Sequence, residues 1–401
     1  MPRENIATED RAMTITAEVK AQAPILGLLN TDLKSEFGSE SGDTVSALIP
    51  GFGQVGEGLA LPSDPSSYAL SIQKVPLQVT PKNIPASYDF IDASIRIGSF
   101  DQKVARPYGA HLASHIRREA FGAILGGATR QFVLNNLADL NFAKVAQAIA
   151  SVEDSNMGGQ INCVLSNRLQ AALTGSGLNQ FQNSNVAFDL WKGEIKNFDG
   201  ADFVSQSEAI KFKAPVITGG TLASSPAEGG DTLNIAFTGM SVGTVIPAGY
   251  VFKIEGINSV DIFKKDDGYA RAFVVQEPVT YNGGTTPVAV KVGKMYAANP
   301  ALKNLTKLPA NGDTVTLLLS GNRTYHTCAI FDQNSTGYAS AAIKEAPGAD
   351  SSVSTVDGFV NVRMTAQFRI ETGLNIVRFD ILTGAKSLYG QGVAGLWVPV
   401  D

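Results

Sequence analysis

Charge is scarce in this sequence: 17% of its 401 residues are Asp, Glu, Lys or Arg, against about a quarter in an average soluble protein. A chain with so little charge either buries much of its surface on partners or exposes an unusually neutral surface, and self-association is the natural expectation. The net charge is −5, so the basic face that tight, sequence-independent nucleic-acid binding requires is not expected. A neutral wall that merely encloses nucleic acid is compatible with this balance.

Cysteine is nearly absent, and long apolar runs are missing. The two cysteines, Cys163 and Cys328, give neither a disulfide framework nor a zinc spacing. No apolar run approaches the roughly 20 residues that cross a bilayer. The charged N-terminus MPRENIATEDRAMTITAEVK lacks the apolar core of a signal peptide. We therefore expect no membrane partner and a chain made and kept in a cytosol-like compartment.

The stretch ALIPGFGQVGEG contains the G-x-G-x-x-G pattern of a dinucleotide-binding turn, at Gly51, Gly53 and Gly56. That fingerprint requires a strand before the glycines, a helix starting on them and an acidic residue about 20 positions further on. Pro62 and Pro65 oppose a helix here, and the region of the expected acid reads SIQKVPLQV. The glycines are therefore predicted to belong to a long, flexible, two-stranded excursion, and no cofactor is expected.

A long helix is predicted from SFDQKVARPYGAHLASHIRREAFGAILGG, residues 99–127. Ser99 and Gln102 have capping-box spacing, and the Gly-Gly pair at the end is a stop signal. Pro107 either kinks this helix or marks its true first turn. The apolar side chains repeat every four residues, at Val104, Tyr108, Leu112, Ile116, Ala120 and Ile124.

Two shorter segments after this helix predict an α/β part. NFAKVAQAIASVED is an amphipathic helix with Phe142, Val145, Ala146 and Ile149 on one face. GGQINCVLSNRLQAALTG reads as a buried strand that runs into a short helix, which Ser166 or Asn167 caps.

The region from about 216 to 330 is predicted to be all β. Its short, glycine-bounded segments DTLNIAFTG, AGYVFKIEGI, SVDIFKK, YARAFVVQEPVTY, PVAVKVG and DTVTLLLSG have the spacing of a small barrel or sandwich. Asp267-Gly268 is a hairpin signal between two of them. Two more strands, GFVNVRMTAQF and TGLNIVRFDILTG, follow near the C-terminus. An all-β block within an α+β chain indicates an inserted domain.

Three features could carry chemistry. His111, His115 and Glu119 share a stripe of the long helix, but the H-E-x-x-H zinc pattern needs Glu directly after the first His, so we expect a solvated or intersubunit polar face. Cys163 lies in an apolar strand and is expected to be a small buried hydrophobe. KKDDGYAR lacks the carboxylate spacing of an EF-hand and is expected to be an exposed hairpin tip. No catalytic, cofactor-binding or metal-binding residue is predicted, and the chain is not expected to be an enzyme.

The order of these parts resembles the major capsid (coat) proteins of tailed bacteriophages, with the Hong Kong 97-type fold. The resemblance implies an α+β fold with an N-terminal arm, an extended β-loop, a long spine helix, and peripheral and axial domains. GDTVSALIPGFGQVGEGLALPSDPSSYALSIQK would be the extended loop, and QFRIETGLNIVRFDILTGAKSL would return to the peripheral sheet. The all-β block is similar to the inserted β-barrel domain of the short-tailed, Salmonella-type phage coat proteins. The best local matches are GLNIVRFDILTGAKSL and GYVFKIEGINSVDIFKKDDGYARAFVV.

The resemblance also assigns a part of the fold to each segment. The expected domains are the N-terminal arm 1–40, the extended loop 41–80, the peripheral domain with the spine helix 81–135, the axial domain 136–215, the inserted β-barrel domain 216–330, and the return to the axial and peripheral domains 331–401. The residues expected to act in assembly are Gly51, Gly53, Gln54, Gly56 and Glu57 at the loop tip, Pro107 and Gly109 where the spine helix bends, and Asp266 and Asp267, whose hairpin is a candidate contact with the next capsomer.

The implied function is assembly. Subunits would form pentamers and hexamers of an icosahedral virion shell, assembled in the host cytoplasm, that encloses double-stranded DNA without binding it specifically. A separate scaffolding protein and a portal protein are the expected partners, expansion on maturation is expected, and a decoration protein is left open. Two alternatives are a bacterial compartment shell with the same fold and a phage tail or receptor-binding protein with a β-domain. The long helix and the α/β part oppose the second alternative.

Overall fold

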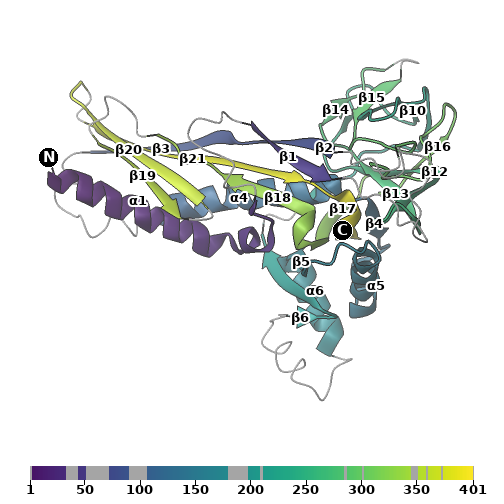
Figure 1. The fold of residues 1–401 in the computed structure, drawn as a ribbon, viewed down its shortest axis with the longest axis horizontal. Coiled ribbons are helices and arrows are strands. Elements are labelled where there is room, and N and C mark those ends of the chain that lie inside the picture. The colour runs from purple at the N-terminus through teal and green to yellow at the C-terminus, as the bar shows by residue number, and fades with distance from the viewer. Residues whose placement is uncertain are drawn as a thin grey trace, which may run out of the picture. The chain divides into compact units, whose positions relative to one another are not determined.

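The computed structural model describes residues 2–32, 44–50, 72–89, 106–178, 197–207, 211–283, 287–299, 302–344, 351–357, 360–371 and 374–400. The chain is mixed α and β (Figure 1). It divides into two compact units. The first comprises Met1–Ala47, Pro76–Ala120 and Gly337–Lys386, and the second comprises Leu48–Val75, Phe121–Thr336 and Ser387–Asp401.

The first unit is built on a sheet of long strands. Its members are β3 (Thr80–Asp89), β18 (Thr336–Ser340), β19 (Ser351–Asp357), β20 (Val360–Arg369) and β21 (Leu374–Ser387). β21 pairs antiparallel with β20 on one side and with β3 on the other, and β19 pairs with β20. Two of these strands, β20 and β21, confirm the strands predicted from GFVNVRMTAQF and TGLNIVRFDILTG.

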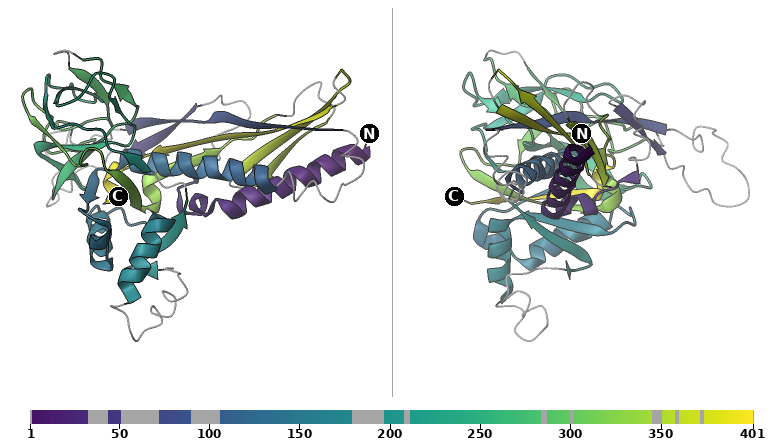
Figure 2. Two further views of the ribbon diagram at one scale, coloured as in Figure 1. Left: turned by 180° about the vertical axis from the view of Figure 1, so that it is seen from behind. Right: turned by 90° about the vertical axis from the view of Figure 1, so that its left-hand side faces the viewer.

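Helices α1 (Pro2–Gln22) and α4 (Arg106–Gly127) lie along one face of this sheet (Figures 1 and 2). Side chains alternate across the strands, so Val362, Met364 and Ile381 are fully buried on the helical face. The ring centroids of Tyr108 on α4 and Phe379 on β21 lie 5.9 Å apart. The segment that the sequence analysis expects to be an arm contains α1 and is largely helical. A 3-10 turn, η1 (Pro24–Leu28), follows α1 and buries two of its side chains.

Helix α4 confirms the predicted apolar stripe as far as it is described. Leu112, Ile116, Ala120 and Ile124 are at most 1% exposed. The predicted cap residues and Val104 lie outside the described residues. The described helix starts at Arg106, which places Pro107 in its first turn, where a proline costs no intrahelical hydrogen bond.

Strands β1 (Thr44–Pro50) and β2 (Ile72–Gln78) form a two-stranded sheet of their own. Both alternate between buried and exposed residues, with Val45 and Leu77 among the buried ones and Leu48 and Ile72 among the exposed ones. A two-stranded pairing therefore occurs where the sequence predicts an excursion.

The second unit contains a seven-stranded sheet, which we call the host sheet. Its strands are β4 (Arg130–Val133), β5 (Ile161–Ser166), β6 (Asn197–Phe198), β7 (Ala201–Gln206), β8 (Lys211–Lys213), β17 (Thr324–Asp332) and β22 (Val393–Pro399). The order is β4-β22-β17-β5-β7-β6, and β8 pairs with β17. Pairs β5–β7 and β22–β4 are parallel and the others are antiparallel.

Helices α5 (Phe142–Glu153) and α6 (Asn167–Leu178) pack on this sheet, as the sequence predicts. Their apolar side chains share one core with β5, β17 and β22. Ser166 caps α6, because its hydroxyl accepts from Leu169 N at 3.3 Å, and this confirms one of the two predicted caps. Of the predicted apolar face of α5, Phe142, Val145 and Ile149 are buried, whereas Ala146 is only partly buried. Ala148 and Val152, which the sequence analysis does not assign, complete this face.

The described residues between 219 and 317 form strands and no helix, and we call this segment the β-block. A six-stranded antiparallel sheet has the order β13-β12-β16-β9-β10-β15, and β11 and β14 form a small second sheet. The strands are β9 (Gly219–Leu222), β10 (Thr232–Thr238), β11 (Val245–Ile246), β12 (Val251–Val260), β13 (Asp266–Val274), β14 (Val279–Thr280), β15 (Val288–Lys291) and β16 (Thr314–Leu317).

Three details differ from the sequence analysis. β17 falls inside the predicted 216–330 block but belongs to the host sheet. SVDIFKK is not a separate strand, because β12 continues to Val260 and a loop follows. That loop is the real turn between β12 and β13, since Val260 pairs with Asp266; Asp267-Gly268 therefore lies on β13 and not at a hairpin tip.

Candidate functional site

The predicted assembly residues have different outcomes. Gly51, Gly53, Gln54, Gly56 and Glu57 lie outside the described residues, so the loop tip stays a prediction. The other four are described, on α4 and on β13.

Gly109 is a point of close approach between two helices of the first unit. A Cβ at this position would lie 3.1 Å from both Cβ and Cγ of Glu18 on α1, which is tighter than ordinary packing contact. Nearby, the Arg117 guanidinium of α4 donates to the carbonyl oxygen of Gln22 at the end of α1. The glycine therefore has a packing role here, and a bend of α4 at Pro107 and Gly109 stays a prediction.

The two aspartates of KKDDGYAR have different environments. Asp266 is exposed, and its carboxylate accepts from Asn258 Nδ2 at 3.1 Å. The side chain of Asp267 is only 2% exposed and is bound within the chain. The expectation of an exposed tip is therefore wrong for Asp267, while a contact of Asp266 with a neighbouring subunit stays a prediction.

Asp267 forms a buried ion pair with Arg130 of β4. Arg130 Nη2 and Asp267 Oδ2 are 2.5 Å apart, and the arginine side chain is 1% exposed. Ser259 Oγ and the backbone N of Tyr269 donate to the same carboxylate, and Arg130 Nη1 donates to the carbonyl oxygen of Ser151. Separating the β-block from the host sheet would leave both buried charges without a partner, which is costly. The pair therefore holds β13 of the β-block against β4 of the host sheet and against the end of α5.

Further contacts join the β-block to its surroundings in the second unit. Ala272 N donates to Thr129 O at 2.8 Å, and the Gln276 side chain donates to the carbonyl oxygen of Gly126 in the last turn of α4. Tyr269 Oη donates to Asp154 Oδ2 at 2.8 Å. The apolar core of the β-block also includes two fully or nearly fully buried side chains of the host sheet, Tyr325 and Trp397. The β-block and the host sheet thus share one continuous core.

The polar stripe of α4 is partly exposed, as expected. His111 and His115 both have exposed surface. Partial desolvation of the His115 imidazole, followed by the charge of Lys82, lowers the pKa of His115. Burial raises the pKa of Glu119, although Lys82 and a hydrogen bond from Thr383 Oγ1 at 3.2 Å oppose the shift. No group of residues in the described part of the chain has the arrangement of a metal site.

The two cysteines are buried neighbours, which their separation in the sequence does not suggest. Cys163 Sγ on β5 lies 3.2 Å from Cys328 Sγ on β17, and both thiols are free. Burial, and then the neighbouring thiol, raises the pKa of Cys163. The prediction of a small buried hydrophobe is confirmed for Cys163, which is 0% exposed.

A serine–histidine contact was not predicted. Ser166 Oγ lies 3.2 Å from His326 Nδ1 on β17, but the same hydroxyl caps α6. Burial, and then the charges of Arg168 and Lys211, lowers the pKa of His326. The charged groups that act on this imidazole among the described residues are cations, whereas the histidine of a hydrolase triad is oriented by a carboxylate. Its role in this geometry is to position the helix cap.

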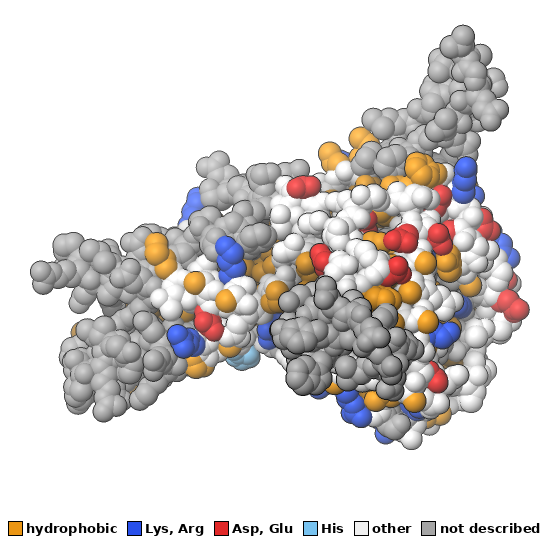
Figure 3. Space-filling view, turned by 90° about the horizontal axis from the view of Figure 1, so that it is seen from below, with side chains coloured by type: hydrophobic (Ala, Val, Ile, Leu, Met, Phe, Trp, Pro, Cys, Tyr) orange, Lys and Arg blue, Asp and Glu red, His pale blue; other side chains and the backbone are white. Residues whose placement is uncertain are grey.

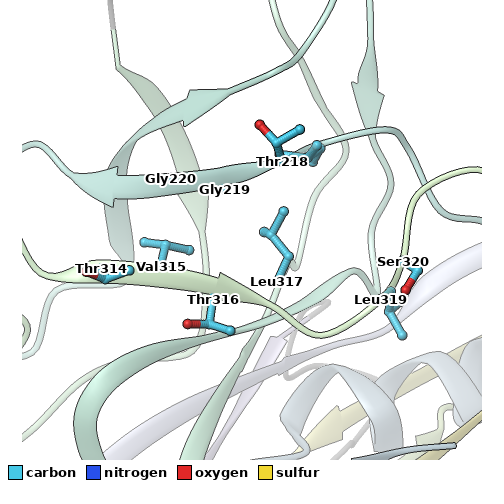
Figure 4. A pocket seen from close by; sticks show the side chains of 10 residues that line it. Thr218, Gly219, Gly220, Thr314, Val315, Thr316, Leu317, Leu319 and Ser320 are labelled. Atoms are coloured by element: carbon cyan, nitrogen blue, oxygen red, sulfur yellow. The ribbon is translucent and has the colours of Figure 1, made fainter. Parts of the chain in front are cut away.

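A hollow of about 390 Å³ opens between β9 and β16 (Figure 4). These strands pair only at Thr221–Thr314 and Gly220–Val315. Beyond that point Thr218 N donates to Thr238 O on β10, so β9 turns away from β16. In Figure 4 the Leu317 side chain points into the gap toward Thr218. All lining residues are uncharged, and the hollow is a local splay of the sheet.

The surface agrees with the low charge content. On the face shown in Figure 3, acidic and basic side chains are scattered among hydrophobic and neutral ones. None of the helices among the described residues has the length and apolar character needed to cross a membrane.

No protein-family model matches the chain, and no curated protein matches it. Similar solved structures include one from Mycobacterium phage Che8, with 14% identity, a TM-score of 0.47, and coverage of 92% of this chain and 89% of that one. The capsid of Ralstonia phage GP4 has 9% identity and a TM-score of 0.46, covering 93% of this chain and 87% of that one. A virus-like particle from Pyrococcus furiosus has 8% identity and a TM-score of 0.44, covering 97% and 98%. At identities and TM-scores this low, the likenesses carry no functional inference, and the function proposed below rests on the chain's own residues.

Proposed function

We propose that this chain is the major capsid protein of a tailed bacteriophage, a shell subunit of the Hong Kong 97 type whose β-block is an inserted domain. The subunits assemble into pentamers and hexamers that enclose double-stranded DNA. A separate scaffolding protein directs assembly, a portal protein occupies one vertex, and the shell expands as it matures in the virion.

The observation that carries this proposal is the two-stranded sheet of β1 and β2. It pairs with no other strand in the described part of the chain, and its buried side chains pack against Ala339 and Ala341, so one of its two faces is covered within the chain. One face is buried through residues such as Val45 and Leu77, while Leu48 and Ile72 are 60% and 48% exposed on the two strands. A neighbouring subunit that covers these side chains would supply the missing layer.

The composition supports the same conclusion. Shell subunits bury much of their surface on copies of themselves. Only 17% of the residues are charged, which fits a surface that is largely covered in an assembly better than the surface of a monomer in water. A heterologous interface that closes into rings is the symmetry requirement for such a shell.

A lysine at position 48 tests the proposal. Leu48→Lys places a charge on a side chain that is already exposed, so the unassembled chain should keep its thermal stability. We expect the variant to lose closed particles in negative-stain electron microscopy and to elute as small species in size-exclusion chromatography. Ala143→Lys, at an exposed position of α5, is the control for added charge away from this sheet. Particles of normal yield from Leu48→Lys would contradict the role given to this sheet.

A further inference from the structure

Two arginines of the first unit share one carboxylate. Asp380 Oδ2 accepts from Arg363 Nε and Nη2, at 3.0 and 2.7 Å, and Asp380 Oδ1 accepts from Arg378 Nε at 2.6 Å. The carboxylate is 4% exposed, the Arg363 side chain 18% and the Arg378 side chain 51%. Two guanidinium groups against one carboxylate leave a net charge of about +1 on this cluster, since arginine is always protonated at neutral pH.

The cluster lies on the face of the sheet opposite to α1 and α4. Strand register places Arg363 and Asn83 on either side of Asp380, and Pro85 beside Arg378. The neighbouring residues Asn83 and Pro85 are exposed. This face is therefore open around Arg378, while Arg363 is partly covered because its Nη1 donates to the carbonyl oxygen of Lys344 at 2.8 Å.

Arg378 is a preoriented fork with unused donors. Its Nε is held by Asp380, and no acceptor for its two terminal nitrogens is found among the described residues. Terminal guanidinium nitrogens held in a plane bind a carboxylate in a bidentate way, and such charge-assisted pairs are stronger than neutral hydrogen bonds. The chemistry that fits the fork is a single carboxylate.

The strand next to the fork favours contact through side chains. Among the described strands, β3 pairs only with β21, and it contains Pro81 and Pro85. Proline lacks the N–H that would pair with an added strand. An incoming partner therefore docks through side chains over this face and not by extending the sheet.

We propose that Arg378 binds an aspartate or glutamate of a second copy of this chain. The inference rests on the proposed function, because it names a contact of the shell. Charge complementarity favours a copy as the partner: the chain carries 37 acidic against 32 basic residues, so each neighbour offers an excess of carboxylates to a locally positive fork. A nucleic-acid backbone would need several cations along its length, whereas this cluster has one uncompensated charge.

The first experiment compares assembly of four chains by sedimentation velocity over a concentration series: wild type, Arg378→Ala, Arg378→Glu and Arg378→Lys. We expect Arg378→Glu to raise the concentration needed for assembly at least tenfold and Arg378→Ala to lie between it and wild type. Arg378→Lys should recover only part of the loss, because lysine keeps the charge but not the planar bidentate geometry. Lys291→Ala is the matched control, because Lys291 pairs with Glu277 of its own chain at an exposed site. Thermal unfolding of the unassembled chains shows whether a variant has lost its fold, and Arg363 still pairs with Asp380 in each of them.

The second experiment identifies the partner. Particles assembled from an equal mixture of isotopically light and heavy Arg378→Lys chains are treated with a water-soluble carbodiimide, which joins an amine directly to a neighbouring carboxylate. We expect cross-linked peptides that pair light with heavy chains, with residue 378 on one side and an Asp or Glu on the other.

The outcomes separate the inference from the proposed function. Assembly of Arg378→Glu at the wild-type concentration, or links from residue 378 only to Asp380 of the same chain, would overturn the inference and leave the shell function intact. Binding of duplex DNA by the unassembled chain that is lost in Arg378→Ala would reassign the fork to phosphate and overturn it as well. A wild-type chain that forms no particles in any condition would overturn the proposed function first.

Discussion

The buried ion pair between Arg130 and Asp267 predicts that the β-block and the host sheet unfold together. Replacing Arg130 with Met removes the guanidinium but leaves a carboxylate that is 2% exposed, with only Ser259 and the backbone of Tyr269 donating to it. Breaking one partner of a buried pair costs about 3–5 kcal/mol. We expect Arg130→Met and Asp267→Leu each to lower the free energy of unfolding by about this amount.

The double variant Arg130→Met/Asp267→Leu should lose clearly less than the sum of the two single changes, because it removes both charges of the pair. It should stay below wild type, because the buried Arg271, whose pKa burial lowers and the charge of Asp267 raises, loses that partner. The two single changes are therefore expected to be strongly non-additive. Urea unfolding followed by tryptophan fluorescence measures this, since Trp397 is fully buried in the core that the β-block shares with the host sheet. A Trp191→Phe background assigns the signal to Trp397.

Lys291→Met is the control for this cycle. Lys291 and Glu277 form an ion pair whose side chains are 47% and 62% exposed, and exposed pairs of this kind contribute little to stability. A loss in Arg130→Met no larger than in this control would refute the reasoning. Separate unfolding transitions for the β-block and the host sheet would refute it too.

Three further predictions concern packing, thiols and pH. Gly384→Ala should destabilise the first unit severely or prevent folding, because the new Cβ would lie 2.2 Å from the backbone oxygen of Gln78; differential scanning fluorimetry measures the loss, with Gly122→Ala, at an open helical position, as control. Both cysteines are buried, so neither should react with a thiol reagent until the chain is unfolded, and rapid modification of the folded chain would contradict the packing of β5 against β17. Burial lowers the pKa of both His115 and His326, so the folded state binds fewer protons than the unfolded state near pH 6. Stability should be intact above the unfolded pKa of about 6.5 and fall as the pH drops below it toward the folded pKa values, and urea midpoints that do not change over this range would contradict the shifts.

Sequence patterns predicted correctly those elements whose formation depends on residues close together in the chain. The four-residue apolar repeat of α4 and the strand–serine–helix junction at Ser166 are both set by neighbours along the chain, and both are found. β9 was missed because its sequence, GGTL, has two glycines and little strand propensity; pairing with β10 and β16 forms it.

The site residues that were misjudged depend on partners far away in the sequence. Asp267-Gly268 has the local signature of a hairpin turn, but Asp267 is bound by Arg130, 137 positions earlier. The contacts between Cys163 and Cys328 and between Ser166 and His326 likewise need the pairing of β5 with β17, which no short pattern encodes. The same holds for the second arginine of the cluster, because Arg363 reaches Asp380 only when β20 and β21 are in register.

The most direct test of the central claim is negative-stain electron microscopy of the purified chain, with size-exclusion chromatography of the same sample. The shell function predicts closed particles, or curved sheets and capsomer-sized rings. A strictly monodisperse monomer at high concentration, both alone and with a candidate scaffolding protein added, would contradict it.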